Sequence, residues 1–311
     1  MPLGIKPTVD FVFKKIFGSL ENTLALKGLL NAILMLKRPI VEVDILNPFS
    51  LKEFAEHKLI VLDVRCRDSA GRSLNVEMQV SVQVGLLERL VYYACSMYVD
   101  QLEAGKNYAQ ARSAISICLV NELIFRDSDQ RHHRFQMVDL ESRRELSDAI
   151  EVHTVELPKY NLDEATISRA SKLDQWVFLL LRAHQYDSRR LKQLLPHAEF
   201  HQAIETLETI AAKTEDRQMY NQREKALRDY EWTLAALKGG EKGSARKGVR
   251  KGVRKGARKE RDAGIEIGKI QVLQELLGDA VSTISELQAK TSAELANLLG
   301  SLQERIRNRP A

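Results

Sequence analysis

The chain has 311 residues, of which 44% are hydrophobic and 29% are charged. This composition is typical of a soluble globular protein, and the length gives a prior of about two domains with ample chain for a core. The formal net charge is +5, but residues 238–261 carry eleven Lys or Arg and two Glu, a net of +9 that leaves −4 for the rest. A mildly acidic body therefore carries one concentrated basic segment.

Targeting and redox signals are weak throughout the chain. The start, MPLGIKPTVDFVFKKIFGS, lacks the apolar segment of a secretory signal, and no uncharged apolar run approaches about 18 residues. The three cysteines, Cys66, Cys95 and Cys118, are far apart, so we expect reduced thiols packed in the core and no C-x-x-C metal or redox site. These features predict a cytoplasmic protein with no membrane segment.

The first half of the chain alternates between helical and strand patterns. Apolar residues recur at helical spacing through residues 8–36, and IVEVDIL at 40–46 alternates as a strand does. Two strands joined by a short turn follow at 59–67 and 74–80, and then a helical stripe at 84–104 before Gly105, a suitable C-cap.

The second half begins with strands and becomes helical. SAISICLVNELIF at 113–125 predicts a buried strand, RFQMVDL and AIEVHTVEL predict shorter strands, and 162–237 is helical with few breakers besides Pro196. Strands interrupted by a helix predict an α/β domain with a small mixed sheet flanked by helices. We expect a core over 1–160, a helical extension over 161–237, a basic glycine-repeat arm over 238–264 and C-terminal amphipathic helices over 265–311.

The basic arm is repetitive. Glycines recur every four residues in units such as VRKG, and each glycine costs roughly 1 kcal/mol against alanine inside a helix, so the arm is a marginal helix or a linker. Segments of this charge are usually nucleic-acid or anion-binding arms, or simply solvated charge. The residues expected to contact phosphates are Arg246, Lys247, Arg250, Lys251, Arg254, Lys255, Arg258 and Lys259.

Two carboxylates interrupt the pair of strands around the turn DSAGR. Parity places Asp63 on one face of the first strand, and Glu77 and Gln79 on one face of the second. A three-residue loop with Gly71 in the left-handed conformation pairs Asp63 with Glu77, whereas a five-residue loop pairs Asp63 with Gln79. Either register brings two carboxylates close together on one face.

Facing carboxylates destabilise a sheet unless a cation, a shared proton or solvent separates them. A hard divalent cation such as Mg²⁺ binds oxygen ligands of this kind and is the usual partner of phosphate substrates. The alternative is an ordinary solvated hairpin face. The pattern alone leaves both interpretations open.

Four blocks in order make the sequence similar to the recombination-promoting nuclease/transposase family, a branch of the PD-(D/E)xK nuclease superfamily. The first is DFVFKKIFG at 10–18, and the second, KLIVLDVRCRDSAGRSLNVEMQV, resembles the catalytic hairpin with D…ExQ in place of D…ExK. ERLVYYACSMYVDQLEAGKNY at 88–108 resembles the following helix, and VELPKY at 155–160 the closing strand. The glycine-repeat tail also resembles the tails of this family.

The resemblance implies a restriction-endonuclease-like core and DNA cleavage that depends on Mg²⁺ or Mn²⁺. Asp63 and Glu77 would ligate the metal together with the backbone carbonyl of Met78, and Gln79 would stand where the superfamily has its lysine. Gln79 could orient the attacking water or touch the phosphate, but it supplies no positive charge.

Four further residues have weaker claims to the site. A migrated catalytic lysine at Lys58 would need a bulge, because an even strand places it on the face opposite Asp63. Arg89 and Tyr93, one helical turn apart, could face the site or a phosphate, although packing and surface pairing are common for such residues. Asp10 fits an ordinary residue at a helix start.

Two functions remain at this point. The first is a metal-dependent DNA endonuclease serving recombination or transposition. The second is a catalytically weak or inactive DNA-binding or assembly protein that uses the basic arm. In both, DNA is the expected partner, and the C-terminal helices are expected to support a homo-oligomer.

Overall fold

The computed structural model describes residues 1–50, 64–82, 85–102 and 107–239, together with short stretches between 282 and 302. The chain forms two compact units, Met1–Trp232 and Thr233–Ala311. Within the part described, no helix is long and apolar enough to cross a membrane. The residues Asp63 and Lys58, and the basic residues of the arm from Arg246 to Lys259, lie outside the described residues.

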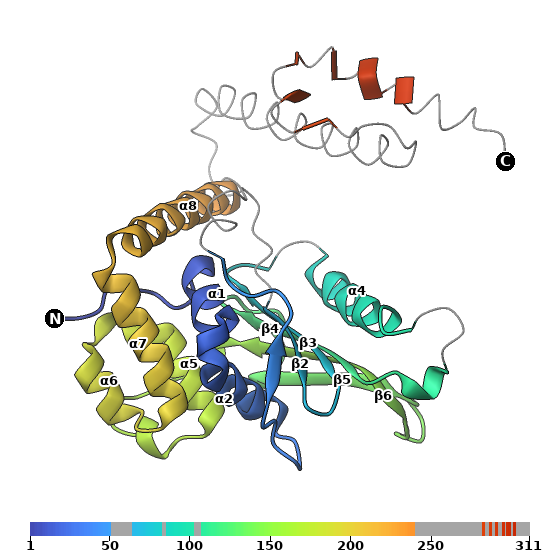
Figure 1. Ribbon diagram of the computed structural model, residues 1–311, viewed down its shortest axis with the longest axis horizontal. Coiled ribbons are helices and arrows are strands. Elements are labelled where there is room, and N and C mark those ends of the chain that lie inside the picture. Colours follow the sequence, from blue (N-terminus) through green and yellow to red (C-terminus); the bar gives the residue numbers. More distant parts are fainter. Residues whose placement is uncertain are drawn as a thin grey trace. The chain divides into compact units, whose positions relative to one another are not determined.

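A six-stranded sheet in the order β1-β2-β3-β4-β6-β5 forms the centre of the first unit (Figure 1). β3, β4 and β6 run parallel, whereas β1, β2 and β5 pair antiparallel to their neighbours. The sheet is therefore mixed, as the pattern of strands predicted. The strands are β1 Val43–Ile45, β2 Val64–Asp68, β3 Ser73–Gln79, β4 Ala114–Val120, β5 His132–Val138 and β6 Glu145–Glu156.

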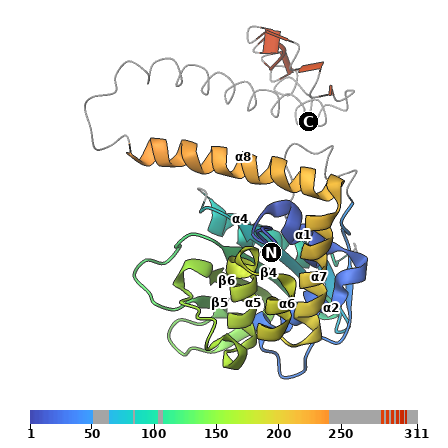
Figure 2. The same ribbon diagram turned by 90° about the vertical axis from the view of Figure 1, so that its left-hand side faces the viewer.

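Helices cover both faces of this sheet. α4 lies on one face, while α1, α2 and α5 lie on the other and α5, α6 and α7 gather beside α2 (Figures 1 and 2). α4 ends at Val99, earlier than the helix expected from the sequence, and Gly105 falls outside the described residues. The helices are α1 Asp10–Gly18, α2 Thr23–Leu34, α4 Leu86–Val99, α5 Lys172–Arg182, α6 Ser188–Leu194, α7 Ala198–Ala212 and α8 Thr214–Gly239.

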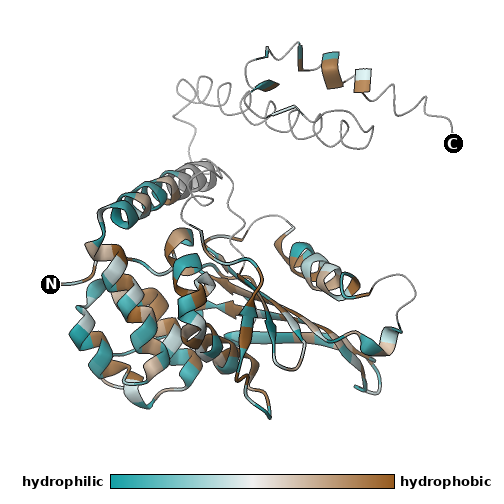
Figure 3. Cartoon of the chain, viewed as in Figure 1, coloured by the Kyte–Doolittle hydropathy of each residue, from teal (hydrophilic) through white to brown (hydrophobic). Residues whose placement is uncertain are grey.

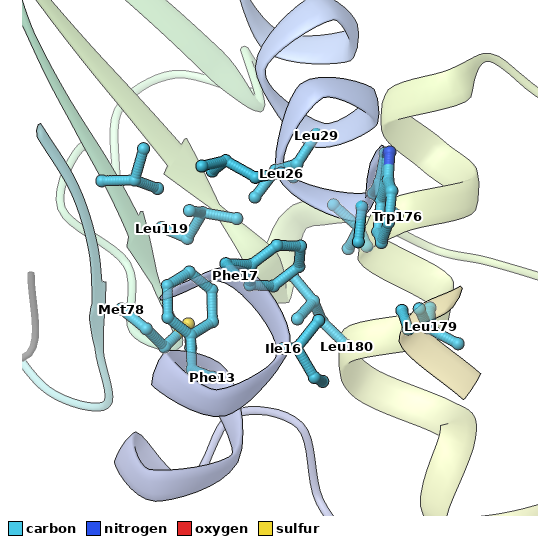
Figure 4. Close-up of a cluster of buried hydrophobic side chains, with 14 of the residues drawn as sticks. Phe13, Ile16, Phe17, Leu26, Leu29, Met78, Leu119, Trp176, Leu179 and Leu180 are labelled. Carbon is cyan, nitrogen blue, oxygen red and sulfur yellow. The ribbon is translucent and has the colours of Figure 1, made fainter. Parts of the chain in front are cut away.

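The main core lies between the sheet and the larger group of helices. Phe13 and Phe17 of α1 and Trp176 of α5 meet there beneath the apolar side chains of the strands (Figure 4). The rings of Phe17 and Trp176 pack edge to face with their centroids 5.5 Å apart. Gly28 is required where α2 crosses α7, because a Cβ there would come within 2.8 Å of Glu199. The helices after β6 thus share the core of the sheet.

A smaller apolar cluster lies under α4. Leu86, Leu90 and Ala94 of that helix cover Cys118 and Val120 of β4. With both faces covered, all seven residues of β4 are buried, which explains the continuous apolar run in its sequence. All three cysteines are free as expected, but Cys95 is exposed and not packed in the core, because it lies on the face of α4 that points away from the sheet.

Hydrophilic and hydrophobic residues are distributed differently over α8 and over the elements of the core. The described part of α8 is largely hydrophilic, whereas hydrophobic residues occur on the strands and on the helices that pack against them (Figure 3). In the second unit, Thr283 and Glu286 exchange backbone and side-chain hydrogen bonds, and so do Thr291 and Glu294. This reciprocal pattern is a capping box, which marks the start of a helix.

Candidate functional site

The register of the β2–β3 hairpin decides between the two pairings that the sequence left open. Val64 pairs with Val76 and Arg65 with Asn75. The amide of Asp68 donates to the carbonyl of Arg72 at 3.1 Å, and Gly71 has φ of +83° in the loop between them. The loop therefore has three residues, as the first alternative predicted, and the five-residue alternative is wrong.

Glu77 lies on the face of β3 that α4 covers. Its side chain is only 1% exposed, and every residue of β3 from Ser73 to Gln79 is buried. The interpretation of this strand as a solvated hairpin face is therefore wrong. α4 covers it because the chain returns across the sheet after β3, a long-range arrangement that alternation within the strand does not encode. A buried carboxylate is costly unless it is paired or binds a metal.

Arg89 of α4 supplies a cation beside Glu77. Its Nη2 lies 3.7 Å from Oε1 of Glu77, and its side chain is 31% exposed. Tyr93 follows one turn later on α4 and is half-buried, with its ring centroid 6.1 Å from that of Tyr92. Arg89 thus faces the candidate site. The sequence had left two roles open for it, contact with the site or a phosphate, and ordinary packing or surface pairing. Surface pairing does not describe a residue that contacts a buried carboxylate.

Met78 and Gln79 follow Glu77 at the carboxyl end of β3. The Met78 side chain points into the main core beside Phe13 (Figure 4), so only its backbone is available on the Glu77 side. Gln79 is 7% exposed, and its carbonyl accepts the amide of Asn121 at 2.8 Å. The parity of the strand places the Gln79 side chain on the same face as Glu77.

A buried ion pair that the sequence reasoning missed lies at the carboxyl end of β6. Glu156 is fully buried, and Oε1 accepts a hydrogen bond from Lys159 Nζ at 2.8 Å. Lys159 also donates to the carbonyls of Phe125 and Gln130 at 2.8 and 3.0 Å, so its three N–H groups are all used. Lys159 therefore ties the end of β6 to the loop after β4. Both residues lie in the block VELPKY. Their spacing of three residues is the feature of the sequence that could have predicted this ion pair.

Asp10 has a structural role at the start of α1. Its Oδ1 accepts the amide of Phe11 at 2.7 Å, and its Oδ2 lies 3.9 Å from Nη1 of Arg223 on α8. Burial raises the pKa of the Asp10 carboxyl, and the amide and Arg223 oppose that shift. These contacts agree with the interpretation of Asp10 as a helix-start residue.

Polar groups without partners surround Glu77 on the covered face. Both amide atoms of Asn75 and the hydroxyl oxygens of Ser116 and Thr154 are buried, and among the described residues they have no hydrogen-bond partner. Leaving such groups unsatisfied costs about 1–3 kcal/mol each. Polar side chains on a covered face, where apolar residues would pack without this requirement, are common at functional sites.

The donors at this site fit a hard divalent cation in kind. They are carboxylate and carbonyl oxygens, and the pairing of Glu77 with Arg89 shows that the position favours positive charge. Among the described residues, no group of three or more His, Cys, Asp or Glu side chains could hold a metal ion. The described part of the site thus contributes one buried carboxylate, Glu77. The second expected ligand, Asp63, directly precedes Val64 in the sequence.

The family model described as PD-(D/E)XK nuclease family transposase matches residues 7–236. The chain belongs to this family. In comparisons with curated proteins and with solved structures, nothing matched. The PD-(D/E)XK match covers the whole sheet and all the helices through most of α8, so α5 to α7 belong to the same family region as the hairpin. It also confirms the family that the four sequence blocks resembled, and it indicates a nuclease with a restriction-endonuclease-like α/β fold.

Proposed function

We propose that this protein is a metal-dependent DNA endonuclease that promotes recombination or transposition. The observation that carries the proposal is Glu77, a buried carboxylate facing a guanidinium on a sheet of the nuclease family. The three-residue hairpin loop supports the pairing of Asp63 with Glu77 that the sequence reasoning derived from it.

In this proposal Asp63, Glu77 and the carbonyl of Met78 hold Mg²⁺ or Mn²⁺. When bound, such an ion supplies an activated water and neutralises charge on the phosphate under attack. Glu77 and Asp63 hold the negative charge that retains the ion, and α4 covers the face of β3 that carries Glu77. Gln79 orients the water or contacts the scissile phosphate through its amide.

Arg89 gives this site a positive charge that Gln79 does not provide. Its guanidinium is within ion-pair distance of Glu77, on the same covered face. A fixed cation near a phosphate stabilises the negative charge that develops during hydrolysis. Arg89 thus supports catalysis despite the missing lysine, and Tyr93 on the next turn lines the same side of α4.

A DNA-binding or assembly protein without cleavage is the second candidate. Gln79 favours it, because the residue lacks the charge of the usual lysine. In this alternative the basic arm binds DNA, the C-terminal helices form an oligomer, and the carboxylates of the hairpin have no catalytic role.

Nicking of a supercoiled plasmid with Mg²⁺ and with EDTA tests the proposal. We expect wild-type cleavage only with the metal, and loss of at least about 100-fold in Glu77→Gln and in Asp63→Asn, since each removes a charge from the ligand set. Glu88→Gln is the matched control, because Glu88 is an exposed carboxylate on the same helix as Arg89. Metal-dependent nicking that survives in both site variants would show that the cleavage chemistry lies elsewhere.

A further inference from the structure

A groove lies between β2 and the end of α4, on the face of the sheet that carries Glu77. Its volume is about 110 Å³, and its lining includes Arg65, Arg67, Ser73, Asp100 and Gln101. Ser73 and Glu77 share one face of β3, which places this groove along the hairpin from the candidate site.

Two guanidinium groups dominate the charge of this groove. Arg65 and Arg67 are alternate residues of β2, so they share a face and their Cα atoms are roughly 7 Å apart. Arg65 is half-buried and Arg67 is exposed, and within the part of the chain that the structure describes neither forms an ion pair. Arg72 on the same hairpin differs, because its Nη2 lies 2.6 Å from Oδ2 of Asp68. The two groove arginines are therefore available to an anion.

The groove adjoins the candidate site through the register of the hairpin. Arg65 pairs with Asn75, and Asn75 and Glu77 are successive residues on one face of β3. Arg67 pairs with Ser73, one further step along the same line. A ligand that reaches Glu77 and extends toward the turn of the hairpin would meet Arg65 first and Arg67 next.

The far end of the groove is held in place by hydrogen bonds between the end of α4 and the chain before β4. The side chain of Gln101 donates to the carbonyl of Arg112 at 2.9 Å and accepts its amide at 2.8 Å, which joins the end of α4 to the start of β4. The exposed Arg112 also packs against the turn, since a Cβ on Gly71 would lie 3.2 Å from its Cγ. Asp100 is the acidic residue that lines the groove.

We propose that this groove binds the sugar-phosphate backbone of the DNA strand next to the phosphate that is cleaved, an inference that rests on the proposed function. Arginine binds phosphate oxygens with paired N–H donors, and a row of such residues positions a strand without reading its bases. Among the described residues these two arginines form no ion pair, and they lie in a line along β2 beside a buried carboxylate. Two cations spaced along a strand favour a polyanion over a single small anion.

Fluorescence anisotropy of the full-length protein with two unrelated labelled duplexes, in EDTA and over a range of salt, tests the groove. Each phosphate contact contributes about 0.9 to the slope of log K against log salt, so Arg65→Gln/Arg67→Gln should make the slope shallower by roughly 2 on both duplexes. Arg65→Lys/Arg67→Lys should retain most of the slope, because the charge remains. The matched control Arg169→Gln/Arg189→Gln removes two exposed charges from the helical side and should leave the slope unchanged.

An unchanged slope in the folded groove variant, or an equal loss in the control, would overturn the proposal. Circular dichroism verifies folding. If the double variant unfolds, the single Arg67→Gln variant replaces it with an expected change of about 1, since Arg67 is exposed. The binding assay contains no metal, so a protein that binds through the groove but never cleaves DNA would contradict only the proposed function.

Discussion

Gln79 is the residue at which this chain departs from the usual PD-(D/E)xK triad. It is almost fully buried on the face that also carries Glu77, so any charge placed there acts across a short distance in a medium of low polarity. Arg89 already brings one cation to this face. A lysine at position 79 would therefore add a second cation to the face on which we propose that DNA is cleaved.

We expect Gln79→Lys to retain cleavage or raise it by up to about tenfold, because a positive charge near the phosphate stabilises the developing negative charge. Burial of the ammonium group should lower the melting temperature slightly. Plasmid nicking under single-turnover conditions measures the rate, and Gln79→Met serves as the uncharged control of similar length. A folded Gln79→Lys protein with no cleavage would mean that the amide has a geometric role which charge cannot replace.

The β5–β6 hairpin carries a histidine chain on the face opposite α4. His132 Nε2 and His153 Nδ1 are 2.8 Å apart, His153 also contacts Glu151, and Arg134 binds Glu151 through two hydrogen bonds of 2.9 and 2.8 Å. Burial, followed by the neighbouring His153, lowers the pKa of His132 to about 4. Burial tends to raise the pKa of Glu151, but hydrogen bonds from His153 and Arg134 outweigh it and bring that pKa to about 2.

These shifts make the stability of the first unit depend on pH in two separate windows. His132 binds a proton in the unfolded chain below about pH 6.5 but in the folded chain only below about pH 4, so its contribution to stability is lost as the pH falls between these values. The Glu151 contribution is lost later, between about pH 4.5 and 2.

Urea unfolding at pH 7.5, 6.0 and 4.5 tests the upper window. We expect the free energy of unfolding to drop by roughly 1–2 kcal/mol over this range because of His132, after allowance for solvent screening at a half-buried group. The drop should be smaller in His132→Asn than in the wild type. The control His197→Gln should show the same drop as the wild type, since His197 is an exposed residue at the N-terminus of α7. Equal pH dependence in His132→Asn and wild type would contradict the assignment.

At the scale of the whole molecule, the largest charge asymmetry separates the family region from the basic arm. The family match ends at residue 236, two residues before the segment 238–261 that carries a net +9. The candidate site and the arm are thus distinct in sequence. Removal of the arm should leave the cleavage chemistry intact.

Deletion of residues 238–262 should weaken DNA binding equally on unrelated sequences, because Lys and Arg on an arm bind phosphates and do not read base edges. If about half of the charges reach phosphates together, the slope of log K against log salt should become shallower by roughly 4. Anisotropy on two unrelated duplexes measures the slope, and metal-dependent nicking provides the control for the remaining chemistry. An unchanged slope would mean that the repeat is a spacer or binds another acidic partner.

Patterns along the chain predicted the features that depend on neighbouring residues. The alternation in β3 and the turn at Gly71 encode the faces of the strand and allow the three-residue loop, because side-chain direction and turn conformation are local properties of the backbone. The helical spacing of α1 and α2 and the apolar run of β4 likewise predicted their elements. The resemblance of the hairpin block to the family then implied that Glu77 is a metal ligand.

The surroundings of that carboxylate depend on packing between segments that are distant in the chain. Whether the polar face of β3 meets water or α4 depends on where a distant helix packs, so the burial of Glu77 and its contact with Arg89 could not be read from the strand. The same holds for Lys159, two of whose N–H groups donate to carbonyls about thirty residues away. It also holds for Arg65 and Arg67, which among the described residues have no carboxylate partner like the one that Arg72 has. Burial and pairing of charged groups depend on long-range packing. They determine the protonation and the reactivity of a side chain, which its residue type alone does not.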